Sequence, residues 1–328
     1  MNTILKVKNL SVQNNYIDIL KDISFDIKKG EILGIVGESG SGKSTLIRAL
    51  IQMMKNSEQI VEGNIEFYNK SLLRMSSKEL RELKGNEIGV VFQNPGTTLN
   101  PIRKIGKQFV EVLKSHTKIS KKEALKRAEI MLEKVNLKNA KCILNSYPFE
   151  LSGGMKQRVA IALAMILEPE LLVADEPTSA LDVTVQAQVV KEMMNLRDKF
   201  NTSIIIVTHS MGVVSYIADK VAVMYCGSIV EYGNKESILK NPKHPYTEAL
   251  INSIPKLDGK LPIGIKGNPP TFTEEKKGCS FASRCDKVNS KCICTTQKLT
   301  QIDNDRWIAC SYIEEMEQSE NERNNSAV

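Results

Sequence analysis

The feature that most constrains this chain is a glycine-rich octapeptide, GESGSGKS, at residues 37–44. It follows the apolar run ILGIV and precedes TLIRALIQMM, whose apolar residues have helical spacing. The pattern G-x-x-x-x-G-K-[ST] between a strand and a helix surrounds phosphate groups with backbone N–H groups and the positive end of a helix. Lys43 then supplies a positive charge at the β and γ phosphates, and the Ser44 hydroxyl is offered to Mg²⁺. We predict a nucleoside triphosphate site made by Gly37, Ser39, Gly40, Gly42, Lys43, Ser44 and Thr45.

The composition is that of a folded, soluble protein. With 328 residues, 41% of them apolar and 25% charged, the chain suits one large domain or two ordinary ones. The longest apolar run, residues 159–167, is much shorter than the roughly twenty residues that span a bilayer. The N-terminus lacks the apolar region of a secretory signal. Lys plus Arg exceed Asp plus Glu (45 against 38), which weakly favours an anionic partner. We therefore expect a cytosolic protein.

The chain divides into segments of different pattern. Residues 1–92 contain short β-type runs separated by turns with glycine, whereas residues 100–165 have apolar residues at helical spacing with charges between them. Strand patterns return in LLVAD, SIIIVTH and KVAVMY, separated by segments of helix length. This order predicts an α/β core over residues 1–235 with a helical subdomain inserted at about residues 97–165.

A second chemical element ends the strand pattern LLVAD. Asp175 and Glu176 are tandem acids, which are costly to bury unless a cation or an ordered water occupies the site. Beside a phosphate site, Asp175 would serve Mg²⁺ and Glu176 would polarise the attacking water as general base. On its own the pair is equally typical of a strand that reaches solvent. The neighbouring phosphate loop favours the catalytic interpretation.

Four further motifs follow in an order that resembles the ABC-type ATPases. Residues 151–158, LSGGMKQR, are similar to the signature of that family, and Gln93 in VFQNP stands in the place of its Q-loop glutamine. Residues 179–182, SALD, resemble the D-loop, and His209 in IIIVTHS resembles the switch histidine. The resemblance covers residues 1–235. It implies a P-loop NTPase fold, with an α/β core and a helical subdomain.

The same resemblance assigns roles to individual residues. Gln93 would contact Mg²⁺ and the attacking water, and His209 would sense the γ-phosphate, so that both join Glu176 in the catalytic set. An aromatic residue near the N-terminus stacks on adenine in this family, and Tyr16 is the candidate here. Ser210 stands where family members usually carry an acid or Asn.

The signature implies that two ATPase chains act together. A serine and two glycines opening a helix form a second anion-binding terminus, for which a single nucleotide in one chain has no use. In the family, two ATPase domains stack head to tail, and the signature of one closes over the nucleotide held by the other. The residues implied in this composite site are Ser152, Gly153, Gly154 and Asp182.

Longer stretches resemble the peptide- and nickel-importing branch, the oligopeptide/dipeptide permease D-type ATPases. These stretches are FQNPGTTLNP, YPFELSGGMKQR, ALDVTVQAQ, HPYTEAL and GCSFASRC; Asn94 and Thr98 replace the commoner Asp and Ser. The resemblance implies an ATPase subunit that powers import of di- or oligopeptides from the cytoplasmic face of the cell membrane. Its implied partners are two membrane permease subunits, a related second ATPase subunit and, indirectly, an extracellular substrate-binding protein.

Other functions compete with this interpretation. Import of nickel or a metallophore fits the same branch. A soluble ABC ATPase acting on nucleic acid usually carries a long heptad insertion or two ATPase cassettes, and this chain has neither. An ATPase of iron–sulfur assembly would explain the cysteines below but not the permease-like stretches. We therefore favour peptide import and expect no nucleic-acid partner.

Cysteine-rich sequence marks a small C-terminal module, residues 236–311, before a polar stretch, 312–328, that predicts a disordered acidic tail. No C-x-x-C pair occurs, which disfavours a zinc ribbon. Irregularly spaced thiols suit an iron–sulfur cluster, and some proteins resembling this one carry a [4Fe–4S] cluster here. Cys294 is an alternative to Cys292, and reduced thiols packed in a small domain are the simpler explanation. The expected cluster ligands are Cys279, Cys285, Cys292 and Cys310.

Overall fold

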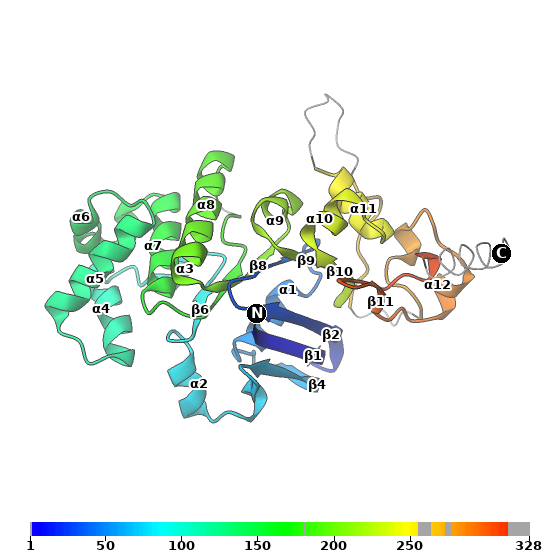
Figure 1. Ribbon diagram of the computed structural model, residues 1–328, viewed down its shortest axis with the longest axis horizontal. Helices are drawn as coiled ribbons and strands as arrows, with labels where there is room; N and C mark the ends of the chain where they lie inside the picture. The colour runs from blue at the N-terminus through cyan, green and yellow to red at the C-terminus, as the bar shows by residue number, and fades with distance from the viewer. Residues whose placement is uncertain (1, 180, 255–263, 273–276, 314–328) are drawn as a thin grey trace.

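The computed structural model describes residues 2–179, 181–254, 264–272 and 277–313. Its centre is a mixed sheet of eight strands, in which five neighbouring strands, β9 to β6 in the order below, are parallel (Figure 1). From one edge to the other the strands are β11 (Thr300–Asp303), β12 (Arg306–Ile308), β10 (Ser228–Asn234), β9 (Lys220–Tyr225), β3 (Ile32–Val36), β8 (Ser203–Thr208), β7 (Leu171–Asp175) and β6 (Ile88–Val91).

A second, antiparallel sheet lies beside the first. Its long β1–β2 hairpin starts the chain, and β4 pairs with the other edge of β1. The strands in order are β2 (Ile17–Lys28), β1 (Thr3–Asn14), β4 (Glu58–Phe67) and β5 (Lys70–Ser71). Together the two sheets form the α/β core that the sequence predicts.

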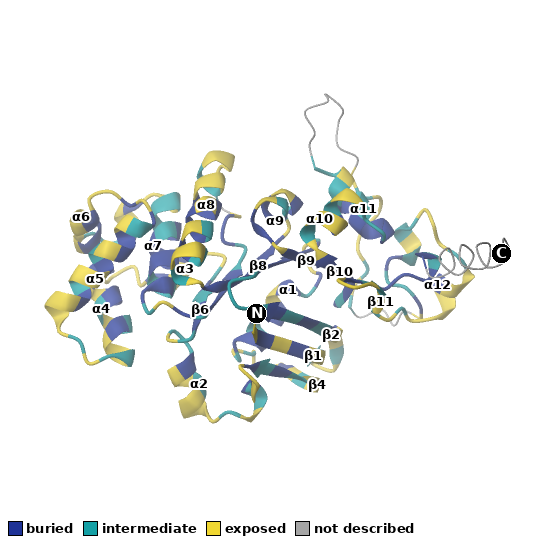
Figure 2. Cartoon of the chain, in the orientation of Figure 1, coloured by how far each residue is buried: buried dark blue, intermediate teal, exposed yellow. Residues whose placement is uncertain are grey.

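The central strands are buried because they are almost entirely apolar. The sequence predicts strands at residues 32–36, 171–175 and 220–225, and the structure confirms each with the same bounds. Successive residues of β8 pack on opposite faces of the sheet: Ile205 joins the cluster shared with the antiparallel sheet, and Ile206 joins the helical side. Covering of both faces explains why these strands lack polar alternation (Figure 2).

The helical insertion forms one end of the molecule, at the left of Figure 1. Its helices bury apolar faces against one another and against α7, in a cluster that includes Phe109, Leu132 and Val159. Ser120 begins α5 by accepting a hydrogen bond from the Glu123 N–H. The elements are α3 (Pro95–Thr98), α4 (Ile105–His116), α5 (Lys121–Lys134), α6 (Ala140–Asn145), η2 (Pro148–Glu150) and α7 (Gly153–Met165).

The other helices connect and cover the strands. Helix α1 follows β3 directly through the glycine-rich loop, and α9 follows β8. These elements are α1 (Lys43–Leu50), η1 (Leu72–Arg74), α2 (Ser77–Leu83), α8 (Val183–Phe200), α9 (Met211–Ile217), α10 (Lys235–Lys240), α11 (Pro245–Asn252), η3 (Ala282–Arg284) and α12 (Ser290–Cys294).

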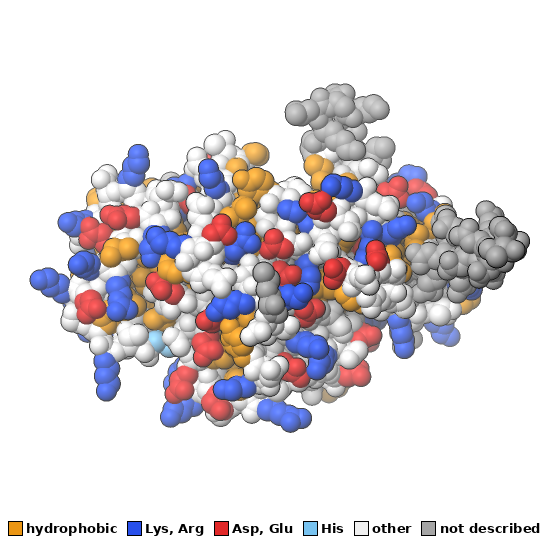
Figure 3. Space-filling view, viewed as in Figure 1, with side chains coloured by type: hydrophobic (Ala, Val, Ile, Leu, Met, Phe, Trp, Pro, Cys, Tyr) orange, Lys and Arg blue, Asp and Glu red, His pale blue; other side chains and the backbone are white. Residues whose placement is uncertain are grey.

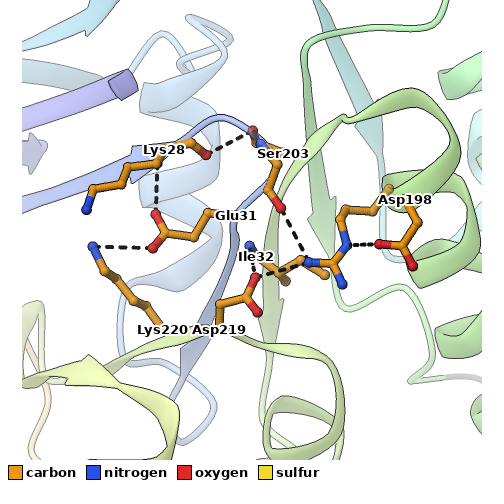
Figure 4. A network of polar contacts seen from close by, with 9 residues as sticks. Lys28, Glu31, Ile32, Asp198, Ser203, Asp219 and Lys220 are labelled. Carbon is orange, nitrogen blue, oxygen red and sulfur yellow. Dashed lines mark hydrogen bonds and ion pairs between the residues drawn. The ribbon is translucent and has the colours of Figure 1, made fainter. Parts of the chain in front are cut away.

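A polar network joins the amino ends of the parallel strands (Figure 4). The Glu31 carboxylate accepts a hydrogen bond from the Lys28 N–H at 2.8 Å and pairs with Lys220 at 3.4 Å. The Asp219 carboxylate accepts from the Ile32 N–H at 2.8 Å. These contacts hold the strand starts in register. The carboxyl ends of these strands lie at the other end of the sheet, and ligands bind at that end in open α/β sheets.

The C-terminal segment is joined to the core sheet. Strand β12 pairs antiparallel with β10, so the sheet of residues 1–235 continues into the segment expected as a separate module at residues 236–311. Arg306 and Glu231 form a buried ion pair across this seam. The part of the expected acidic tail beyond residue 313 lies outside the described residues.

None of the helices in the described part of the chain is long and apolar enough to cross a membrane.

The face shown in Figure 3 carries Lys and Arg side chains interspersed with Asp and Glu. Among the described residues on this face, the basic side chains form no single patch that would by itself indicate a polyanionic partner.

Candidate functional site: a phosphate loop at the carboxyl ends of the strands

The phosphate loop connects β3 to α1 and depends on glycine, as Gly42 and Gly37 illustrate. Gly42, the N-cap of α1, has φ +99°, which residues with a side chain rarely adopt. A Cβ atom on Gly37 would lie 2.1 Å from the Met224 carbonyl oxygen on β9. The loop can therefore pack directly on the sheet, with the N-terminus of α1 at its end.

The Lys43 amine lies inside the loop. Its Nζ donates hydrogen bonds to the carbonyl oxygens of Gly37 at 2.8 Å and Glu38 at 2.7 Å. Burial lowers the pKa of Lys43, and the negative charges of Glu176 and Asp175 oppose this shift. When a nucleotide binds, the Lys43 ammonium can replace its hydrogen bonds to these carbonyl oxygens with hydrogen bonds to phosphate oxygens.

A cavity of about 720 Å³ opens at the phosphate loop. It brings together the loop, Gln93, Glu176 and His209, which are distant in the sequence but were all predicted as site residues. The lining residues are Asn14, Ile19, Ser39, Gly40, Gly42, Lys43, Ser44, Thr45, Gln93, Glu176, Ser179, His209 and Phe272.

Glu176 is the centre of a polar triad in this cavity. Its Oε2 accepts hydrogen bonds from Gln93 Nε2 at 3.3 Å and from His209 Nδ1 at 3.1 Å. The backbone of Glu176 has φ +43°, a left-handed conformation that a glutamate adopts only at a cost. Backbone strain of this kind concentrates at functional sites, and here it directs the carboxylate at the end of β7 toward the glutamine and the histidine.

Asp175 and Ser44 provide a donor set that fits Mg²⁺. Asp175 accepts a hydrogen bond from the Ser44 hydroxyl; burial first, and then the charge of Glu176, raise its pKa. Its Oδ1 is buried without a hydrogen-bond partner among the described residues. A carboxylate oxygen that lacks a partner, next to a hydroxyl, suits a hard cation that prefers oxygen ligands.

The predicted adenine-stacking residue lies elsewhere. Tyr16 is 95% exposed in the turn between β1 and β2, and it does not line the cavity. The β1–β2 hairpin contributes Asn14 and Ile19 to the lining of the cavity, and Phe272 also lines it. Phe272 was not expected from the sequence, because an isolated aromatic residue in a Pro-rich loop carries no signal of what it packs against.

The signature residues open helix α7. The Ser152 hydroxyl accepts a hydrogen bond from the Met155 N–H at 3.3 Å, and a Cβ on Gly153 would meet open space. Asp182 caps α8 in the same way, through the Val185 N–H at 2.9 Å. None of Ser152, Gly153, Gly154 and Asp182 is among the described residues that line the phosphate-loop cavity of this chain.

Departures from the usual family residues serve local capping. Ser210 begins α9 by accepting a hydrogen bond from the Val213 N–H at 3.3 Å. Asn94 caps α3 through the Gly96 N–H at 2.9 Å, and the Thr98 hydroxyl donates to the Asn94 carbonyl at 3.2 Å. Ser210 and Asn94 therefore each cap a helix, whereas Thr98 bonds to the backbone of the residue that caps α3.

The four predicted cluster cysteines gather in one region. Burial raises the pKa of Cys279 to about 11, and the charges of Cys292, Cys310 and Cys285 add to the shift. Cys294 is exposed. Within the described ranges, no group of three or more His, Cys, Asp or Glu side chains is placed to hold a metal ion. A metal ion or cluster held by these residues would have to displace the thiol protons, because only thiolates act as ligands.

Two family profiles match the chain. The one described as "ABC transporter" covers residues 20–179, and the one described as "Oligopeptide/dipeptide transporter, C-terminal region" covers residues 230–292. The chain is 43% identical to the oligopeptide transport ATP-binding protein AppD of Bacillus subtilis, over 96% of this chain and 98% of that protein. It is 45% identical to the dipeptide transport ATP-binding protein DppD of Lactococcus lactis, over 86% and 82% of the two chains.

Solved structures agree with the fold. A dimeric ATP-binding cassette in a post-hydrolysis state with ADP and Pi has a TM-score of 0.64 and 28% identity, covering 71% of this chain and 99% of that one. CbiO1 of Clostridium perfringens, part of the ABC transporter complex CbiONQ, has a TM-score of 0.64 and 31% identity, covering 74% and 92%. The chain belongs to the ABC transporter family of ATPases, in the branch of the oligopeptide and dipeptide transport ATP-binding proteins.

Proposed function

We propose that this ATPase powers the import of di- and oligopeptides through a membrane ABC transporter. The observation that carries the proposal is the extent of the likeness. It includes the C-terminal region as well as the ATPase core, and the relatives with which it is shared are oligopeptide and dipeptide transport proteins. Nickel or metallophore import remains the alternative within the branch. The likeness across the C-terminal region disfavours two other functions: a soluble ATPase that acts on nucleic acid, and an ATPase that assembles iron–sulfur clusters.

Hydrolysis follows from the residues around the cavity. Glu176 accepts a proton from the attacking water as general base, while Gln93 and His209 orient its carboxylate. Lys43 neutralises the β and γ phosphates. Ser44 and Asp175 would hold Mg²⁺, which when bound spreads the developing negative charge of the phosphates. Together these residues would activate a water molecule and stabilise the phosphate groups that it attacks.

A second ATPase subunit completes each site in this proposal. Ser152 and the open Gly153 form a helix N-terminus suited to an anion, yet neither lines the cavity of its own chain. The γ-phosphate held by a partner chain is the anion that such a surface would meet. The solved relative with ADP and Pi is a dimer. We expect the partner to be a related but different ATPase.

The permease subunits would dock beside Gln93. A groove of about 580 Å³ runs between the end of α1, the β6 region and the helical subdomain, with Met53, Phe92 and Val112 among its lining residues. A helix from a membrane subunit in this groove would contact the segment that carries Gln93 and so connect transport to hydrolysis. The chain would then lie on the cytoplasmic face of the membrane, with the extracellular binding protein as an indirect partner.

Reconstitution tests the cargo. The full transporter in liposomes, with its binding protein, should show faster ATP hydrolysis when di- or oligopeptides are supplied on the outer side. Nickel with a chelator serves as the matched alternative cargo. Stimulation by the nickel complex, with none by a peptide library, would contradict the peptide assignment and leave the ATPase assignment intact.

The cysteine cluster is open to a direct test as well. The prediction from the sequence is that protein purified without oxygen is brown, with about four irons per chain. Its support is the gathering of Cys279, Cys285, Cys292 and Cys310: burial raises the pKa values of Cys279 and Cys310, and the charges of Cys292 and Cys285 contribute to both shifts. Replacing Cys285 with Ser should then remove the colour, whereas Cys294→Ser should not. Colourless protein with one zinc, or without metal, would rule out the cluster.

A further inference from the structure

Glu38, the second residue of the phosphate loop, is held through three of its groups. Its N–H donates a hydrogen bond to Tyr246 Oη at 2.9 Å, and its carbonyl oxygen accepts one from Lys43 Nζ at 2.7 Å. Its carboxylate accepts two hydrogen bonds from the Arg284 guanidinium, at 2.7 and 3.0 Å. Tyr246 and Arg284 both belong to the C-terminal region, so that region contacts the phosphate loop directly.

The arginine side of this contact is buried. The Arg284 side chain is only 3% exposed, and its Nε donates to the Lys266 carbonyl at 2.7 Å. Its NH1 also donates to Tyr225 Oη at 3.2 Å. The rings of Tyr225 and Tyr246 lie 4.6 Å apart. We call Tyr225, Tyr246 and Arg284 the Glu38 clamp.

Local sequence places Tyr246 in the clamp. His244 is the N-cap of α11, and its Nδ1 accepts a hydrogen bond from the Tyr246 N–H at 3.0 Å. Pro245 occupies the first helical position, where its missing N–H costs nothing. His244 is 1% exposed, and burial lowers its pKa to about 3, so the ring stays neutral and keeps accepting. The stretch His-Pro-Tyr thus fixes the start of α11 and, with it, the backbone position of Tyr246.

Charge gives the clamp a second consequence. A free carboxylate on the phosphate loop would repel the polyphosphate chain of a nucleotide. The bidentate ion pair with Arg284 neutralises Glu38, and a pair of this geometry is the strongest kind that arginine forms. Removing only the arginine would leave the carboxylate both mobile and uncompensated.

We propose that Arg284 is a positioning residue for ATP binding, which holds Glu38 in place and neutralises its charge from the C-terminal region. The inference rests on the proposed phosphate-binding role of residues 37–44. If Arg284 has this role, the C-terminal region determines part of the affinity for ATP, independently of any metal bound by its cysteines.

A double-mutant cycle on the full chain tests the proposal. Arg284→Gln should raise the Kd for Mg-ATP about tenfold, with a smaller change in kcat, because no group that touches the reacting atoms is altered. Glu38→Gln combined with Arg284→Gln should recover most of the affinity, since the uncompensated charge is then gone. Tyr246→Phe removes one hydrogen bond and should weaken binding about threefold.

Two further variants separate the possible failures. Lys287→Gln breaks an exposed ion pair of the same region, with Glu248 at 2.9 Å, and should leave the Kd unchanged. Lys43→Ala tests the phosphate site itself. Full affinity in Arg284→Gln, with affinity lost in Lys43→Ala, would overturn the clamp alone. The clamp would also be overturned if Arg284→Gln lost affinity for Mg-ATP and the added Glu38→Gln change did not restore it. That result is expected if Arg284 only stabilises the fold.

Discussion

Glu176→Gln should bind Mg-ATP with an affinity close to that of the native chain and hydrolyse it about 10²–10⁴-fold more slowly, the usual cost of losing a general base. The amide can still accept a hydrogen bond from Gln93 or His209, whose distances to the native carboxylate are 3.3 and 3.1 Å. It cannot take the proton of the attacking water. Steady-state phosphate release and equilibrium ATP binding, measured on the same preparation, separate the two effects.

The same variant should accumulate as an ATP-bound dimer with its partner ATPase, because binding is retained while the step that separates the subunits is blocked. Glu168→Gln is a suitable control. Glu168 precedes the same strand, but its 56%-exposed side chain pairs with Lys134 at 4.0 Å, away from the cavity. Native hydrolysis rates in Glu176→Gln would exclude Glu176 as the base.

Lys43→Ala should lose affinity for ATP by at least about tenfold, since a hydrogen-bonded charge at the phosphates is removed. In the free protein the amine holds the loop carbonyls of Gly37 and Glu38, at 2.8 and 2.7 Å. Its removal also abolishes the cost of burying an ammonium, the effect that lowers the pKa of Lys43. We therefore expect the thermal midpoint without nucleotide to change little.

Calorimetric titration of ATP checks this result. Lys8→Ala is the matched control, because the Lys8 side chain is exposed and pairs with Glu66 at 3.4 Å on the surface of the antiparallel sheet. ATP affinity unchanged in Lys43→Ala would mean that the phosphates lie outside the loop of residues 37–44. The outcome would then also remove the basis for the Glu38 clamp.

Local patterns predicted the elements that hold the site. The strands at residues 32–36 and 171–175 are runs of apolar residues long enough to be buried on both faces, and the structure confirms their bounds. The glycine-rich loop was predicted because its conformation depends on its own residues, with φ +99° at Gly42. Glu176 was predicted from the tandem acids beside the phosphate loop and His209 from the family resemblance, and the structure places His209 Nδ1 3.1 Å from Glu176 Oε2.

Contacts between distant segments were beyond the reach of such patterns. Arg284 and Glu38 are 246 positions apart, and nothing local to either residue indicates the other. Phe272 lines the cavity although it lies in a Pro-rich loop, while Tyr16, chosen by its position near the N-terminus, is exposed in a turn. The pairing of β12 with β10 likewise joins a segment that composition alone marks as separate.

The sequence by itself determined the strand–loop–helix that is predicted to bind phosphate and the order of motifs that defines the family, because these depend on residues that are neighbours in the chain. Only the tertiary structure decided which side chains meet at the loop. In the folded chain, Gln93 and His209 both hydrogen-bond to the Glu176 carboxylate, and Arg284 hydrogen-bonds to the Glu38 carboxylate. The physical reason is that burial and charge pairing act between surfaces, and surfaces are formed only when the sheets and helices pack.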